Sequence, residues 1–98
     1  MDNFSVNISI DDCLCCKCNT CNKMVTEILT GLDQFIPLQC GYYLKLIAVE
    51  NNSVVISIDN DFLYIVRRIY IGVPIRICMP NNCCKHTLTI SVNSITAT

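Results

Sequence analysis

The stretch of sequence that decides the fold reads Asn3-Phe4-Ser5-Val6-Asn7-Ile8-Ser9-Ile10, and every second residue in it is apolar. A strict period of two places all the apolar side chains on one face of an extended chain. We therefore expect residues 3–10 to form a β-strand that buries one face in a core. Asp11-Asp12 ends the alternation.

Similar patterns continue in the second half of the chain. Runs of β-branched and aromatic residues cover Tyr42 to Glu50 and Ser53 to Ile58, and Asn51-Asn52 between them suits a tight hairpin turn. Three more strand-like runs cover Phe62 to Ile71, Val73 to Cys78 and His86 onward, and Pro74 places the second of these toward a sheet edge. The sequence predicts a mainly β fold, a single small antiparallel sandwich or jelly-roll-like domain of about six strands and one short helix.

The helix is expected over residues 22–36, where the apolar residues fall on one stripe at helical spacing. Asn22 suits the N-cap position, and Pro37 would end the helix. Gly31 lies inside this stretch and weakens it by about 1 kcal/mol relative to alanine. The residues of the stripe are Met24, Val25, Ile28, Leu29, Leu32, Phe35 and Ile36.

Length and composition indicate one folded domain. The chain has 98 residues, 52% of them hydrophobic and 15% charged, which excludes extensive disorder. The net charge is −1 and the seven basic residues are scattered, so a nucleic-acid partner is not expected. The uncharged apolar run from Ile69 to Ile75 is far shorter than the roughly 20 residues of a membrane-spanning helix. Residues 1–5 show neither the basic nor the apolar region of a Sec-type signal peptide.

The first and last expected strands carry Ser, Thr and Asn on the face turned away from the core. Edge strands usually carry charges there, because charges prevent pairing with the edge of another molecule. Two interpretations are open: an ordinary Asn-rich surface, or a surface used in assembly.

Nine cysteines are the main chemical feature of the chain, and five of them lie between Cys13 and Cys21. This density is typical of a small domain held by disulfides or by a metal. We divide the chain into residues 1–21, an N-terminal strand with a cysteine-rich connector, and residues 22–98, a β-rich body with the helix near 22–36.

One interpretation of the cysteines is a metal site. Cys18 and Cys21 form a CxxC pair, and Cys83, Cys84 or His86 would complete a zinc or iron–sulfur ligand set. The second group is not a CxxC pair, however, and the separation of the two groups matches none of the common zinc-finger spacings. A small intracellular metal-binding module therefore stays as an alternative.

The other interpretation is disulfide bonding between copies of the chain. The Cα atoms of adjacent residues lie about 3.8 Å apart, closer than a disulfide usually allows, so each member of the doublets Cys15-Cys16 and Cys83-Cys84 needs a partner elsewhere. An odd number of cysteines also leaves at least one without a partner in an oxidised monomer. The candidates for intermolecular disulfides are Cys13, Cys15, Cys16, Cys18, Cys21, Cys78, Cys83 and Cys84.

The sequence does not indicate an enzyme. His86 is the only histidine, and its spacing from Cys84 is common by chance. No stretch resembles a paired-carboxylate site or a phosphate-binding glycine loop. We expect no catalytic residue and no cofactor, and a disulfide-stabilised monomer that binds another protein is a further alternative.

The cysteine doublet near the N-terminus, the β-rich body and the missing signal peptide together resemble the cysteine-rich subunits of endospore appendages, which are pilus-like fibres on the spores of Firmicutes. The resemblance implies a jelly-roll body that pairs edge to edge with copies of itself, and a connector held in neighbouring subunits by disulfides. Cys15 and Cys16 would correspond to the connector doublet, and Cys78, Cys83 or Cys84 to the receiving cysteines. The resemblance also implies a location on the spore surface or outside the cell. Such a protein needs no Sec signal, because it is made in a mother cell that later lyses.

Overall fold

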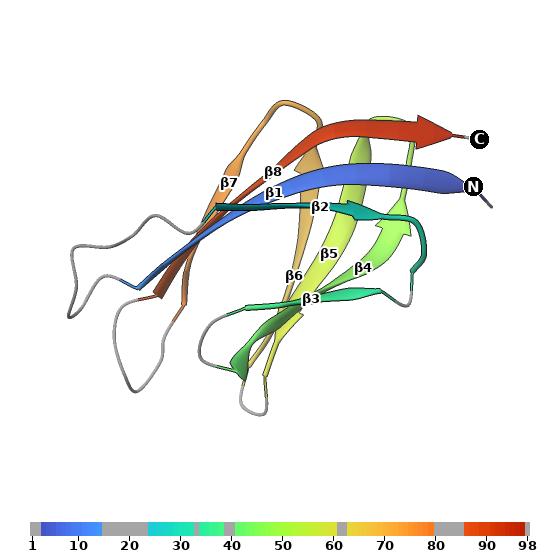
Figure 1. Cartoon of the computed structure of the whole chain (residues 1–98). Coiled ribbons are helices and arrows are strands. Elements are labelled where there is room, and N and C mark those ends of the chain that lie inside the picture. Colours follow the sequence, from blue (N-terminus) through green and yellow to red (C-terminus); the bar gives the residue numbers. More distant parts are fainter. Residues whose placement is uncertain are drawn as a thin grey trace.

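The computed structural model describes residues 3–14, 24–32, 34–38, 41–60, 63–79 and 86–97. They form two four-stranded antiparallel sheets packed face to face (Figure 1). Sheet A has the strand order β2-β1-β8-β7, with β2 at Met24–Leu29, β1 at Phe4–Leu14, β8 at His86–Ala97 and β7 at Ile75–Met79. Sheet B has the order β3-β4-β5-β6, with β3 at Phe35–Pro37, β4 at Tyr43–Val49, β5 at Ser53–Asp59 and β6 at Tyr64–Tyr70. The predicted mainly β sandwich is confirmed.

Nearly all paired strands are neighbours in sequence. The exception is β1, which pairs with β8 and so joins the two ends of the chain within sheet A. The chain passes between the sheets from β2 to β3 and from β6 to β7, and at the second passage Ile71 bridges Val92 while the Gly72 N–H donates to the Val92 carbonyl at 3.1 Å. This is an up-and-down order, whereas a jelly roll contains two Greek keys.

The core lies between the sheets and follows the predicted alternation. On β1, Val6, Ile8 and Ile10 are at most 1% exposed, and the intervening polar residues are half-buried on the outer face. Burial of such side chains is the main favourable term in folding. The other core residues are Phe4, Leu29, Ile36, Tyr42, Leu44, Leu46, Val54, Ile56, Ile58, Ile69, Ile77, Leu88, Ile90 and Val92.

The turns expected from the sequence also match the structure. Asn51-Asn52 connects β4 to β5, and the Glu50 N–H donates to the Ser53 carbonyl at 2.8 Å. The strand after Pro74 is β7, which lies at one edge of sheet A, as predicted.

The predicted helix over residues 22–36 is wrong. In the described part of this stretch, Met24–Leu29 is strand β2 and Phe35–Pro37 is strand β3, and no helix is present among the described residues. β2 pairs with β1 in a register that buries Leu29 opposite Val6 and leaves Ile28 60% exposed on the other face. The Gln34 side-chain oxygen accepts hydrogen bonds from the Thr30 and Gly31 N–H groups and fixes a turn between the strands. Pairing with β1 therefore outweighs the helical spacing.

The first and last strands, β1 and β8, are the two central strands of sheet A. β1 and β8 pair from Phe4 opposite Ala97 to Leu14 opposite His86. Their polar side chains lie on the outer face of sheet A, where Asn93 Nδ2 donates to Asn7 Oδ1 at 2.9 Å and to Ser9 Oγ at 2.8 Å. Because β1 is central and supplies core residues, it belongs structurally with the body that was predicted to begin at residue 22.

No helix in the described residues is long and apolar enough to cross a membrane.

Candidate functional site

Two of the candidate cysteines lie in described strands. Cys13 is in β1 and Cys78 is in β7, whereas Cys15, Cys16, Cys18, Cys21, Cys83 and Cys84 lie outside the described residues. The register places Cys13 opposite Thr87 of β8, and Thr87 opposite Cys78. The two cysteine positions therefore share one row across sheet A, with β8 between them.

The spacing of this row decides what the two cysteines can do. Neighbouring strands lie about 4.8 Å apart, so the Cα atoms of Cys13 and Cys78 are separated by roughly 10 Å. Cα atoms joined by a disulfide are usually about 4.4–6.8 Å apart. Cys78 is an exposed free thiol on the outer face, and its strand neighbour Ile77 is buried. Cys78 can therefore form a disulfide with Cys13 only if the sheet is distorted, and it is open to a thiol from elsewhere.

Strands β1 and β7 end, and β8 begins, at the same end of sheet A. Leu14, the last residue of β1, pairs with His86, the first residue of β8, and His86 pairs with Met79, the last residue of β7 (Figure 1). Residues 15–23 follow Leu14, and residues 80–85 connect Met79 to His86. Eight of the nine cysteines lie within these two stretches of sequence or in the row itself: Cys13, Cys15, Cys16, Cys18, Cys21, Cys78, Cys83 and Cys84.

The metal alternative rests on side chains that lie outside the described part of the chain. They contain no group of three or more His, Cys, Asp or Glu side chains placed to hold a metal ion. The proposed ligands Cys18, Cys21, Cys83 and Cys84 lie outside the described part, and only the backbone of His86 is described.

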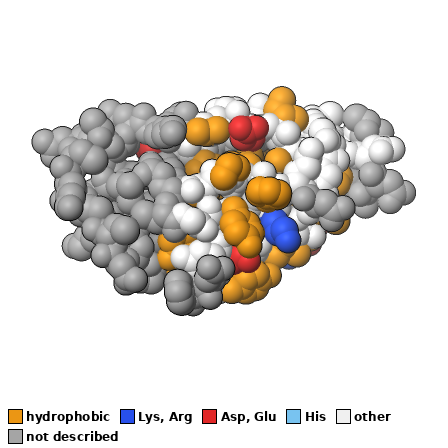
Figure 2. Space-filling view, turned by 60° about the horizontal axis from the view of Figure 1, so that its bottom comes forward, with side chains coloured by type: hydrophobic (Ala, Val, Ile, Leu, Met, Phe, Trp, Pro, Cys, Tyr) orange, Lys and Arg blue, Asp and Glu red, His pale blue; other side chains and the backbone are white. Residues whose placement is uncertain are grey.

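A second feature is the outer face of sheet B, which the sequence interpretation missed. It presents large apolar side chains that a core would normally cover: Phe35 is 61% exposed, Tyr64 63% and Tyr70 49%. Figure 2 turns the bottom of the molecule forward and shows hydrophobic side chains gathered in the middle of the visible face. We call this surface the sheet B face; its apolar members are Leu32, Phe35, Tyr43, Ile47, Tyr64, Val66 and Tyr70.

Polar groups are set among these apolar side chains. A hollow of about 620 Å³ is lined by Phe35, Lys45, Ser57, Asp59 and Tyr64 together with other residues of the face. Ser57 is 2% exposed, and Asp59 Oδ1 is buried without a hydrogen-bond partner. Both signs of charge therefore face the same hollow.

The rest of the face is held by fixed contacts. Arg68 Nη1 lies 2.9 Å from Glu50 Oε2 and donates to Ser53 Oγ at 2.9 Å. The rings of Phe35 and Tyr43 meet edge to face with centroids 5.9 Å apart. These contacts hold side chains of neighbouring strands in place, so the face is an ordered surface.

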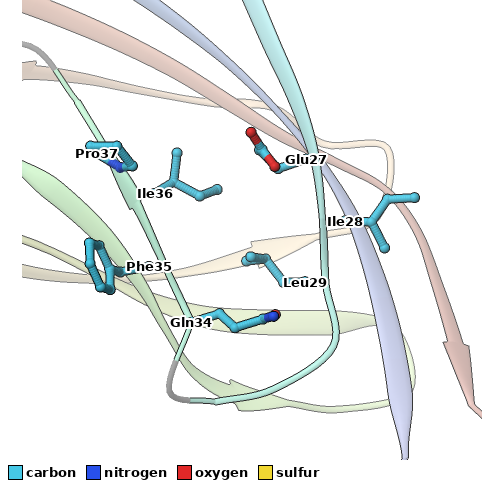
Figure 3. A pocket seen from close by; sticks show the side chains of 7 residues that line it. All are labelled: Glu27, Ile28, Leu29, Gln34, Phe35, Ile36 and Pro37. Atoms are coloured by element: carbon cyan, nitrogen blue, oxygen red, sulfur yellow. The ribbon is translucent and has the colours of Figure 1, made fainter.

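A groove of about 430 Å³ lies between β2, an edge strand of sheet A, and β3, an edge strand of sheet B. Figure 3 shows Leu29 and Ile36 pointing into it from opposite strands, while Ile28 points away. Glu27 also borders the groove and is exposed. No backbone ladder joins β2 to β3 among the described strands, so each keeps an edge that another strand can pair with.

The sequence did contain a signal for the sheet B face. Tyr43, Lys45 and Ile47 alternate with buried residues on β4, and Tyr64, Val66 and Arg68 share one face of β6. Tyr64, Val66 and Tyr70 are large apolar residues at positions where a solvent-facing strand usually carries polar ones. A strand with apolar side chains on both of its faces is typical of a sheet that other parts of a protein cover on both sides.

Together, the described residues define a small antiparallel β-sandwich with an exposed thiol, Cys78, on sheet A and an apolar outer face on sheet B. Comparison with protein-family models, with curated proteins and with solved structures finds no match for this chain.

Proposed function

We propose that this protein is a structural subunit that assembles with copies of itself, and that disulfides between copies join the assembly. The observation that carries the proposal is the row Cys13, Thr87 and Cys78, in which β8 separates the two cysteines and Cys78 is exposed. Among the described residues, Cys13 is the only other cysteine and lies too far from Cys78 for a disulfide in an undistorted sheet, so the exposed thiol is open to a cysteine of another copy.

The architecture supports the same role in two further ways. The described core contains no cysteine, so the β-sandwich has packing that does not depend on disulfides. The edge strands β2, β3, β6 and β7 have no second strand partner among the described strands, and such edges are where copies of a β-protein pair. The resemblance to spore appendage subunits accords with this role and extends the proposal to a place on the spore surface or outside the cell.

We expect the purified, oxidised protein to run as a ladder of multimers on a non-reducing denaturing gel and as a single band near 11.0 kDa after reduction. Cys78→Ser should shift the ladder toward the monomer, because it removes the exposed thiol of the row. Arg76→Ser is the matched control, since Arg76 is an exposed residue of the same strand face.

A single monomer band in both lanes would refute covalent assembly. The same non-reduced sample also tests the metal alternative, because thiolates bound to zinc or iron are not in disulfides. One zinc or iron atom per chain, together with the monomer band, would favour the metal-binding module.

A further inference from the structure

We infer that the sheet B face is a non-covalent interface between two copies of this chain, formed independently of any disulfide. This goes beyond the proposed function, because it concerns the opposite sheet from the cysteine row and requires no oxidation. Residues of all four strands of sheet B contribute to the face, which therefore presents one continuous surface.

The size of the apolar surface fits one side of a dimer. An aromatic side chain offers roughly 200 Å², and Phe35, Tyr43, Tyr64 and Tyr70 are between 37% and 63% exposed. With Leu32, Ile47 and Val66, the exposed apolar area is on the order of 600 Å², which is at the upper end of the largest patches on monomeric proteins. A standard interface buries about 800 Å² on each partner, so this patch and its polar rim are sufficient.

The charges of the face indicate that the partner is a second copy. Asp59 Oδ1 is buried without a hydrogen-bond partner, and Lys45 makes no ion pair within the described residues. A two-fold axis in the plane of the face, between these two side chains, would place each Lys45 against the partner's Asp59. Each contact would then occur twice, as in every two-fold interface.

Other classes of partner fit these charges less well. A uniformly acidic peptide would offer no cation to Asp59, and a uniformly basic one would offer no carboxylate to Lys45. Leaving a buried charge or acceptor unpaired carries a large desolvation penalty. Arg68 does not add an unpaired charge to the face, because its Nη1 lies 2.9 Å from Glu50 Oε2. A second copy supplies both a cation and a carboxylate at once.

The test is sedimentation equilibrium of the full chain in reductant, so that no disulfide contributes to the mass. We expect twice the monomer mass of 11.0 kDa. Tyr64→Ser should raise the dissociation constant at least about tenfold, because a largely exposed aromatic residue at an interface is a typical hot spot. Ile28→Ser is the matched control, since Ile28 is 60% exposed on the outer face of sheet A and should leave the mass unchanged.

A charge exchange makes the test specific for a second copy. Lys45→Asp and Asp59→Lys should each weaken the dimer at least about tenfold, and the double exchange should restore it. A cooperative thermal transition in each variant shows that it folds. A monomer at up to about 100 µM, well above the Kd of ordinary interfaces of this size, would overturn the inference. A dimer that none of these substitutions weakens would also overturn it. Neither result bears on the disulfide ladder, which is measured without reductant.

Discussion

Ile8→Asp will leave the chain unfolded at room temperature. Ile8 is fully buried in β1, which lies between β2 and β8, so the new carboxylate would be placed between the two sheets. An unpaired charge in an apolar core costs several kcal/mol, and the substitution also removes the packing of the isoleucine. A domain of this size has a total stability of only about 5–15 kcal/mol, so a loss of this kind removes most or all of it.

The measurement is far-ultraviolet circular dichroism with thermal melting, beside the matched variant Ser5→Asp. Ser5 lies on the same strand but on the outer face, half-buried, and its substitution should change the free energy of unfolding by no more than about 1 kcal/mol. If Ile8→Asp melts cooperatively near the wild-type temperature, then β1 is not a central strand of the core.

Replacing Cys13, Cys15, Cys16, Cys18 and Cys21 together by serine should remove the disulfides of the connector and keep the fold. The described core contains no cysteine, and Leu14 is the only large aliphatic residue between Cys13 and Cys21. The monomer should therefore keep a cooperative melt, while the resistance of the assembly to heat and detergent is lost.

The outcome that contradicts this prediction is an unfolded serine variant. Small domains commonly lose about 2–5 kcal/mol with each native disulfide, and metal-dependent domains unfold without their ligands. An unfolded variant would thus show that residues 13–21 hold the monomer together and do not serve as a connector.

The strands could be predicted wherever one face is buried and the other is polar. Val6, Ile8 and Ile10 alternate with polar residues, so a period of two was visible in the sequence. The helix prediction for residues 24–29 was wrong because their apolar residues occur in adjacent pairs, Met24-Val25 and Ile28-Leu29. This spacing also suits a helix. The edge position of β2 leaves Ile28 exposed, and only the pairing of β2 with β1 shows which residues face the core.

The candidate sites could be predicted only in part, because they depend on contacts between distant segments. The cysteines were evident, but the row of Cys13, Thr87 and Cys78 requires the pairing of β1 with β8, which joins opposite ends of the chain. The apolar residues of the sheet B face were visible one strand at a time. These residues form one surface because the strands pair in the order β3-β4-β5-β6, and no local sequence pattern specifies that order.

The central claim is that copies of this chain form a polymer, and electron microscopy of the oxidised protein tests it most directly. The account predicts fibres or extended sheets that shorten or disperse when reductant is added, because the bonds between copies are disulfides. Separate globular particles of the dimensions of one subunit, 43 × 25 × 17 Å, or of two, with no extended assembly in the oxidised sample, would contradict it.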